Sequence, residues 1–366
     1  MRVAHLSSAH QRYDTRIYKK MCSSLSRKFN MVLIVADDKG NEVTKNNVTI
    51  IDIGKAKSRI SRFYKTTRLI YLEAIKLDYD LYHLHDPELI PVGVKLKKLG
   101  KKVIFDAHED LPKQLLGKPY LNVFFRRILS ICFSLFEKAA CKNFDSIVTA
   151  TPAICKKFKK INKNTNDINN YPLLDELSNS MKWENKASEV SYVGGISRIR
   201  GINQLISAMD HTSGIKLNLA GNFNEKKLIE DVQNLPGWSK VDFHGYLDRE
   251  GVRLMLSRSV AGLVTFLPSP NHIDAQPNKM FEYMSAGIPI VTSFFPLWRE
   301  IVEGNECGIC IDPNRPDEIG EAIQYLIDNP EESRIMGERG RFAIEKKYNW
   351  KIEEKKLFNI YRDLLA

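Results

Sequence analysis

Short apolar runs alternate with amphipathic segments along almost the whole chain, and this alternation restricts the possible fold more than any other feature. In the first half, the apolar runs lie at residues 3–7, 31–36, 48–53, 81–85, 102–106 and 146–149. Segments with apolar residues at helical spacing, such as residues 17–29, separate these runs. Strands that alternate with helices form a parallel sheet with helices on both faces. We therefore predict a doubly wound α/β domain.

The alternation begins again after a polar, asparagine-rich stretch at residues 162–170. The second series of apolar runs lies at residues 189–193, 215–220, 241–245, 260–266, 288–292 and 308–311. A chain of 366 residues is long enough for two such domains. We predict an N-terminal domain at residues 1–175, a C-terminal domain at residues 186–348, and a last helix at residues 349–366.

The composition favours an anionic partner in a reducing compartment. A formal net charge of +11 attracts nucleotide diphosphates, acidic lipid headgroups or nucleic acid. No run of 18 uncharged apolar residues occurs, so we expect no spanning helix, and residues 3–7 have the pattern of a strand rather than of a signal peptide. The six cysteines show no disulfide-rich pattern, and the single C-x-x-C pair, Cys307 and Cys310, is weak support for zinc. We expect a cytoplasmic protein.

The stretch DAQPNKMFEYMSAGIPIV, residues 274–291, combines a loop, a helix and a strand. Gly287 lies where a left-handed C-terminal cap is expected. The N-terminus of the helix offers N–H groups and partial positive charge to a phosphate, and Lys279 adds a full charge in its first turn. Asp274 precedes the helix and Glu282 lies eight residues later, so one carboxylate could face a sugar and the other a ribose diol.

Polar side chains also gather where the predicted strands of the first domain end. They are residues 8–16 after the first strand, His85, Asp86 and Glu88 after a second, and His108, Glu109 and Asp110 after a third. In open α/β sheets, ligands bind beyond the carboxyl ends of the strands. A lone histidine at a strand end is usually a structural hydrogen-bonding group, but several at successive strands favour a site. We expect these residues to open into one cleft between the domains.

A glycine-rich turn, VGGISRIRG at residues 193–201, opens the second domain. Glycines after a strand let the backbone approach a phosphate, and the basic residues neutralise it. Such turns are common, so this one alone is not specific. Two further turns follow later strands, one containing Gly221 and one containing Tyr246.

Together these stretches resemble the family 4 retaining glycosyltransferases, which have the two-domain GT-B fold. Asp274 and Glu282 match the acid-x7-Glu signature, which normally begins with Glu, and FEYMSAGIPIV is a close match. HLHDPE at residues 83–88 and DAHE at residues 106–109 resemble signatures of the first domain. HQRYDTR at residues 10–16 resembles the first loop of a subgroup that makes bacterial surface polysaccharides.

The resemblance implies two Rossmann-like domains facing across a cleft, with the last helix bracing the first domain. It implies retaining transfer of a sugar from a nucleotide sugar to a lipid-linked or oligosaccharide acceptor, with no metal and no other cofactor. The family usually has Arg where this chain has Gly195, and Arg198 is the candidate to replace it. The implied residues are His108 and Asp274 for catalysis; Gly195, Arg198, Arg200, Gly221, Tyr246, Asn278, Lys279 and Glu282 for the donor; and Arg16, His85, Asp86 and Glu109 on the acceptor side.

Three other functions remain open at this point. The first is a sugar-nucleotide 2-epimerase, which shares the GT-B architecture. The second is a non-catalytic protein that binds a nucleotide sugar or a lipid. Nucleic-acid binding ranks lower, because no recognised nucleic-acid module is visible. Two metal motifs, Asp78-Tyr79-Asp80 and His83-Leu84-His85, are interpreted as a surface coincidence and as an incomplete ligand set.

Two segments of the first domain are basic and amphipathic, residues 55–72 and residues 120–136. Lys55, Arg59, Arg62 and Lys65 recur at helical spacing in the first segment, and apolar side chains surround two arginines in the second. Such helices lie in a membrane interface, where apolar burial and attraction to anionic lipid add together. Both segments could instead be ordinary cover helices. We predict peripheral docking on the inner face of the cell membrane, where a lipid-linked acceptor would be presented.

Overall fold

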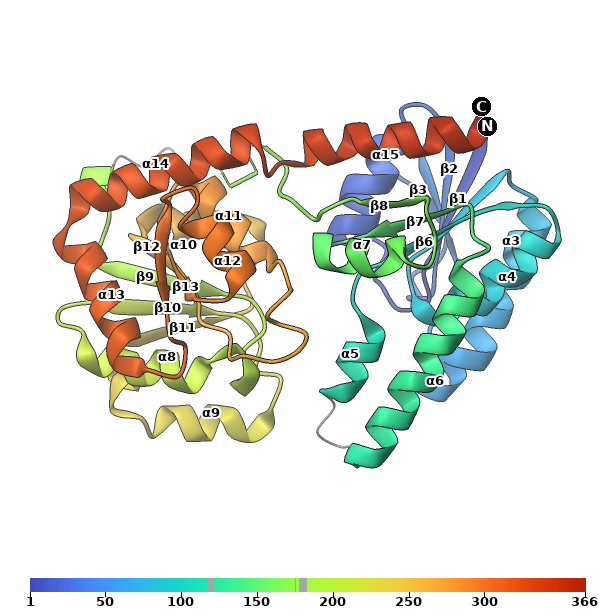
Figure 1. Cartoon of the computed structure of the whole chain (residues 1–366). Coiled ribbons are helices and arrows are strands. Elements are labelled where there is room, and N and C mark those ends of the chain that lie inside the picture. Colours follow the sequence, from blue (N-terminus) through green and yellow to red (C-terminus); the bar gives the residue numbers. More distant parts are fainter. Residues whose placement is uncertain (118–121, 175, 178–182) are drawn as a thin grey trace. The chain divides into compact units, whose positions relative to one another are not determined.

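The computed structural model describes residues 1–117, 122–174, 176–177 and 183–366 (Figure 1). The chain divides into two compact units. Unit 1 comprises Met1–Asn170 together with Trp350–Ala366, and unit 2 comprises Tyr171–Asn349. Each unit is a twisted sheet with helices on both faces, which confirms the predicted pair of doubly wound α/β domains. Residues 120–121 of the second amphipathic segment lie outside the described residues.

The sheet of unit 1 has the strand order β3-β4-β2-β1-β5-β6-β7-β8. All of its paired strands run parallel except β3 and β4. The order reverses between β1 and β5, and such a switch point is where ligands bind in this fold. The strands are β1 (Arg2–Leu6), β2 (Asn30–Val35), β3 (Glu42–Val43), β4 (Val48–Asp52), β5 (Leu81–Leu84), β6 (Lys102–Ala107), β7 (Ser146–Thr149) and β8 (Thr165–Asp167).

The two faces of the unit 1 sheet differ in chemistry. One face buries Leu6 and Leu84 in an apolar core with α3 (Thr67–Leu77), α4 (Ile90–Lys98) and α6 (Val123–Cys141), which lie side by side. Strand residues alternate between faces, so the other face carries His5 and its cross-strand neighbour His83. The helical segment η1 (Thr15–Cys22) and the last helix α15 (Trp350–Leu365) cover that face.

The position of α15 confirms that the last helix packs on the first domain. Trp350 Nε1 donates to Ser24 Oγ at 3.0 Å, and the backbone N–H of Asn169 donates to Glu353 Oε2 at 2.8 Å.

The helix predicted at residues 17–29 has other bounds in the structure and consists of two segments. It is η1 followed by the short α1 (Ser23–Leu25), and the side chain of Asp14 caps its start.

The sheet of unit 2 is wholly parallel, in the order β11-β10-β9-β12-β13-β14, and its switch point lies between β9 and β12. The strands are β9 (Glu189–Val193), β10 (Lys216–Ala220), β11 (Val241–Gly245), β12 (Ala261–Val264), β13 (Ile290–Ser293) and β14 (Gly308–Ile311). The helices include α8 (Ile202–Ala208), α9 (Lys226–Gln233), α10 (Arg249–Arg258), α11 (Asn278–Ala286), α12 (Pro296–Val302), α13 (Pro316–Asp328) and α14 (Pro330–Lys346).

Helix α11 ends as its sequence predicts. Gly287 adopts a left-handed conformation with φ +70°, and its N–H donates to Met284 O at 3.0 Å. The N–H of Ile288 then donates to Tyr283 O at 3.2 Å, so this residue completes the cap and β13 begins two residues later than expected. Within the described ranges, no helix is long and apolar enough to cross a membrane.

Candidate functional site

Three loops meet at the switch point of unit 2. The backbone N–H of Leu267, beyond β12, donates to Ile199 O in the loop after β9 at 3.0 Å. Gly221, at the end of β10, has φ +146°, and a Cβ there would lie 1.9 Å from the carbonyl oxygen of Gly194. Only glycine allows this approach. At this end of the unit 2 sheet, three segments therefore lie close together: the glycine-rich turn, the end of β10 and the loop that leads to α11.

Two cationic side chains border the glycine-rich turn. Lys279 comes from the first turn of α11, and Arg200 donates from Nη1 to Gly195 O at 2.9 Å. A Cβ built on Gly194 would lie 3.4 Å from Lys279 Nζ and 3.9 Å from Arg200 Nη1. Lys279 Nζ also lies 3.5 Å from the centroid of the Tyr192 ring. The two cations thus approach the same short piece of backbone.

The ammonium group of Lys279 is buried, and no hydrogen-bond partner for it is present among the residues that the structure describes. Burial lowers the pKa of Lys279 well below its ordinary value, and the neighbouring Arg200 lowers this pKa further. A buried cation without an anionic partner costs free energy. The partial positive charge at the N-terminus of α11 adds to the same potential. This corner of unit 2 is therefore built to receive an anion.

The carboxylate of Glu282 is held by an arginine that the sequence interpretation missed. Arg249 Nη1 donates to Glu282 Oε1 at 2.8 Å, and Arg249 Nε donates to Glu176 Oε1 at 2.9 Å. Burial opposes the charge of Arg249, but the two carboxylates raise its pKa overall. Glu282 thus has a fixed orientation on α11. Nothing local in the sequence marks Arg249, because its partners lie far away along the chain.

The remaining predicted donor residues separate into those near the cationic pair and those engaged elsewhere. Arg198 forms ion pairs with Glu225 and Asp231, so it does not replace an arginine at Gly195. Arg200 fills that space, since a Cβ at Gly195 would lie 2.7 Å from Arg200 Nη1. Asp274 lies in the loop before α11, and Asn278 is the first residue of that helix. Trp298 anchors the loop by donating from Nε1 to Ala275 O. Tyr246 follows β11 and is exposed.

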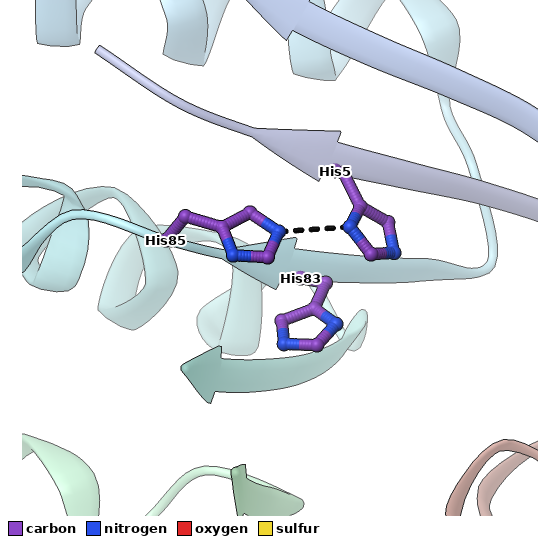
Figure 2. Close-up of side chains that lie close together, drawn as sticks. All are labelled: His5, His83 and His85. Carbon is purple, nitrogen blue, oxygen red and sulfur yellow. Dashed lines mark hydrogen bonds between the residues drawn. The ribbon is translucent and has the colours of Figure 1, made fainter. Parts of the chain in front are cut away.

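In unit 1, the switch point carries a cluster of buried imidazoles. It contains His5 from β1, His83 from β5 and His85, which follows β5, and their rings lie against one another (Figure 2). His5 Nδ1 is 2.8 Å from His85 Nε2. The rings of His83 and His85 stack with centroids 4.6 Å apart. His5 was missed by the sequence interpretation, because only the strand order shows that β1 lies beside β5.

A buried carboxylate connects this cluster to His108. Asp106 Oδ2 lies 3.2 Å from His85 Nδ1 and 2.9 Å from His108 Nε2. Arg16 binds the same carboxylate with two hydrogen bonds, of 2.9 and 2.7 Å. Although burial favours the neutral acid, Arg16 and the histidines hold the pKa of Asp106 well below its ordinary value. Burial lowers the pKa of His85 to about 4, so this imidazole is neutral near pH 7.

The other predicted acceptor-side residues hold loops in place. Asp86 accepts hydrogen bonds from Ser7 Oγ at 2.9 Å and from the N–H of Ser8 at 2.7 Å. Glu88, a strand-end residue that was not assigned to the acceptor, pairs with Arg62 Nε at 2.7 Å. Glu109 accepts a hydrogen bond from Gln114. Of the predicted residues of unit 1, His85 thus lies in the imidazole cluster itself, and Arg16 and His108 are connected to it through Asp106. The single cleft expected between the two switch points stays a prediction.

Among the residues that the structure describes, two groups lie close enough together to ligate a metal ion: His5 with His83 and His85, and His85 with Asp106 and His108. Both nitrogens of His5 and of His85 already lie in hydrogen bonds. At the D-x-D sequence, Asp78 pairs with Lys101 at 2.7 Å, and Asp80 accepts from the backbone N–H of Arg2 at 2.8 Å. The two acids of this motif are therefore occupied by separate partners.

Comparisons with known proteins agree with this architecture. Residues 175–342 match the family described as glycosyl transferases group 1. Alpha-D-kanosaminyltransferase of Streptomyces kanamyceticus is 24% identical over 180 residues, which are 48% of this chain and 45% of that protein. The chain thus matches less than half the length of that relative.

Solved structures resemble the chain over its whole length. Sucrose-phosphate synthase of Thermosynechococcus elongatus has a TM-score of 0.80 at 18% identity, covering 100% of this chain and 99% of that one. HepE of Anabaena, solved in complex with UDP-glucose, has a TM-score of 0.76 at 13% identity, covering 99% and 100%. Residues 175–342 of this chain therefore match the glycosyl transferases group 1 family, and the whole chain has the GT-B fold.

Proposed function

We propose that this protein is a retaining glycosyltransferase that moves a sugar from a nucleotide-sugar donor to a glycan acceptor. The observation that carries the proposal is the buried ammonium of Lys279, which has no hydrogen-bond partner in the described part of the chain and lies with Arg200 beside the glycine-rich turn. In a glycosyltransferase domain, the diphosphate of the donor is the anion that this pair of cations would bind. UDP and UDP-glucose, found with HepE, are the first probes to use.

The proposed reaction needs stabilisation where the charge develops. The bond between the anomeric carbon and the diphosphate oxygen breaks, and its electron pair stays on the leaving diphosphate. An acceptor hydroxyl oxygen forms the new bond on the same face of the sugar and gives its proton to the departing phosphate. Lys279, Arg200 and the N-terminus of α11 would stabilise the negative charge, so the mechanism requires no metal.

The carboxylates and the histidine have separate roles in this proposal. Glu282, oriented by Arg249, would accept hydrogen bonds from the ribose hydroxyls. Asp274, in the loop before α11, would bind hydroxyls of the transferred sugar. His108 of unit 1 would accept a hydrogen bond from a hydroxyl of the sugar. These roles use groups whose hydrogen-bonding capacity matches a hydroxyl-rich ligand.

A thermal-shift screen tests the donor. A ligand that binds only the folded state raises its melting temperature, so we expect a rise with UDP and with at least one UDP-, GDP- or dTDP-sugar. NMR of the products formed with an added glycan acceptor should then show a glycoside with the anomeric configuration of the donor. Inversion would contradict a retaining mechanism. An epimeric free sugar formed without acceptor would indicate the epimerase, and no binding of any nucleotide would contradict the proposal as a whole.

The acceptor is proposed to be lipid-linked, in the synthesis of a bacterial surface polysaccharide, because one face of unit 1 has the chemistry of a membrane-docking surface. Helix α6 leaves Phe124 68% and Phe125 61% exposed, so neither is a core residue. Phe133 packs partly against the core. In the segment before α3, Ile60 and Tyr64 are 73% and 78% exposed. Monomeric proteins rarely leave such large apolar side chains together in water.

Basic side chains surround these apolar groups. Arg59, Lys65 and Arg68 are exposed on the segment that leads into α3, which lies on the same face of the sheet as α6. Arg62 is different, since it is occupied by the ion pair with Glu88. An anionic membrane surface is the partner that combines apolar contact with attraction to several cations, at about 1 kcal/mol for each Lys or Arg near the surface. We therefore propose peripheral binding to the inner leaflet.

Cosedimentation with vesicles tests this surface. Binding to phosphatidylglycerol vesicles should exceed binding to neutral phosphatidylcholine vesicles and should fall with added salt. Changing Arg59, Lys65 and Arg68 to Glu should abolish it. The matched control changes Lys28, Lys351 and Lys355 to Glu. Lys351 and Lys355 are exposed on α15, and Lys28 is an exposed lysine that lies over the ring of Phe358 on the same helix. Equal loss in both triple variants, or no binding at low salt, would contradict docking through α3 and α6.

A further inference from the structure

The imidazoles of unit 1 are joined to the last helix by one continuous series of hydrogen bonds. Tyr361 Oη from α15 lies 2.8 Å from His5 Nε2 and 2.7 Å from His83 Nδ1. His5 Nδ1 in turn lies 2.8 Å from His85 Nε2 (Figure 2). Tyr361, His5 and His83 are completely buried. None of these three residues has a role in the proposed donor site.

Asp106 determines which ring nitrogens of His85 and His108 carry protons. Its carboxylate is ionised by the two hydrogen bonds from Arg16, so it only accepts hydrogen bonds. Both nitrogens that face it, His85 Nδ1 and His108 Nε2, must therefore carry protons. These two nitrogens are also 3.4 Å from each other. Since both are donors, that contact is no hydrogen bond, and Asp106 Oδ2 is the common acceptor.

The remaining protons then have a single arrangement. A neutral imidazole has one donor nitrogen and one acceptor nitrogen, so His85 accepts at Nε2 from His5 Nδ1–H. His5 consequently accepts at Nε2 from the hydroxyl of Tyr361. That hydroxyl has only one proton, so Tyr361 accepts from His83 Nδ1–H. His83 Nε2 is left as an acceptor, and it is buried without a partner among the residues described.

The reverse arrangement would place an acceptor nitrogen of His85 against the Asp106 carboxylate. That nitrogen would then compete with Asp106 for the proton of His108 Nε2, which is already 3.4 Å away. We propose that Tyr361 and His5 are positioning residues: they satisfy His85 at Nε2, in the tautomer that Asp106 requires, and so hold the His85 ring with its Nδ1–H and His108 Nε2–H both on Asp106, with His108 Nδ1 left to meet the substrate. The role of His108 toward a sugar substrate rests on the proposed function, but the proton arrangement does not.

The charged and titratable groups around His108 are few. Asp106 and His85 face it from β6 and the end of β5, and the ring of His10, from the loop after β1, has its centroid 5.0 Å away. His10 lies 3.3 Å from Asp14 at its Nδ1. The other ring nitrogen of His10, Nε2, lies 3.5 Å from Asp86, so both nitrogens face carboxylates outside the series that leads to Tyr361.

The test is ¹⁵N NMR of the whole chain labelled at its eight histidines, which distinguishes protonated from unprotonated ring nitrogens. At neutral pH we expect the proton on Nδ1 in His5, His83 and His85, and on Nε2 in His108. Tyr361→Phe removes the hydroxyl without changing the ring, and it should alter the resonances of His5, His85 and His108. Tyr82→Phe is the matched control, since this buried hydroxyl donates to Ala74 O at 2.6 Å, accepts from the N–H of Tyr79 at 2.8 Å and lies in the apolar core on the other face of the sheet.

The outcomes are distinct. A proton on Nε2 of His5 or His85 in the wild type would overturn the proposal, and so would a His108 signal that Tyr361→Phe leaves unchanged. Equal changes in the two phenylalanine variants would show a general packing effect, which also overturns it. If no nucleotide sugar binds in the thermal-shift screen, the proposed function fails while these tautomers can still be found as predicted.

Discussion

Replacing Lys279 with Met tests the anion site through two quantities, the affinity for UDP and the stability of the free protein. The substitution keeps a long unbranched side chain but removes the ammonium that is buried beside Arg200 without a hydrogen-bond partner in the described ranges. A charge-assisted hydrogen bond to a ligand is worth about 1.5–3 kcal/mol, which corresponds to about a 10- to 150-fold weaker Kd for UDP. Without ligand, the same change removes an unsatisfied buried group that costs about 1–3 kcal/mol.

We therefore expect Lys279→Met to bind UDP more weakly and yet to unfold at a higher temperature. For a unit of this size, each kcal/mol moves Tm by about 2–4 °C. Calorimetric titration with UDP and thermal unfolding measure the two effects. Lys186→Met is the control, because Lys186 is a partly buried lysine of unit 2 that donates to Ser257 O and Ser259 O at 2.8 and 2.7 Å. It should lose stability and keep its affinity for UDP.

The lowered pKa of Lys279 also makes the stability of the protein and its affinity for UDP depend on pH. Burial lowers the pKa of Lys279 below that in the unfolded chain, so between these two pKa values the unfolded chain binds more protons than the folded one. The free energy of unfolding of the free protein should therefore rise with pH across this window, and the affinity for UDP should fall. Lys279→Met should lack both trends. Unchanged UDP affinity in this variant would refute the assignment of the anion site.

Three further predictions concern the same unit. Glu282→Ala and Arg200→Ala should each lower kcat/KM for the donor by about 10- to 150-fold at saturating acceptor, with the far-ultraviolet circular dichroism unchanged, and unchanged kinetics in both would remove the donor assignment. Activity should survive excess EDTA, whereas a loss that Mg²⁺ or Mn²⁺ restores would show that a metal takes part. Gly221→Ala should lower the free energy of unfolding by about 1–3 kcal/mol, because a Cβ there meets the Gly194 carbonyl, and a stable variant in denaturant titration would contradict this close approach.

The strands and the end of α11 could be predicted because their signals are local. A short apolar run between helical segments suffices to locate β7, β9, β11 and β14 at the bounds expected. Gly287 marks the end of α11 for the same reason, since only its own backbone conformation matters. The identity of Lys279 as a residue of the first helical turn also needs no distant information.

The side-chain partners could not be predicted, because they depend on strand order and on helices that are distant in sequence. Arg62 has the pattern of a membrane-facing residue, yet it pairs with Glu88. Arg198 lies in the glycine-rich turn but is held by Glu225 and Asp231. His5 stands alone in an apolar strand, and its relation to His83 and to Tyr361 exists only once β1 lies beside β5 and α15 covers both.

A crystal structure of the protein with UDP tests the central claim most directly. The account predicts that oxygens of the diphosphate lie within about 3 Å of Lys279 Nζ and of the Arg200 guanidinium, at the N-terminus of α11 and over the glycine-rich turn. The ribose hydroxyls should then lie against the carboxylate of Glu282. UDP bound elsewhere, with Lys279 still buried and without contact to the diphosphate, would contradict the account.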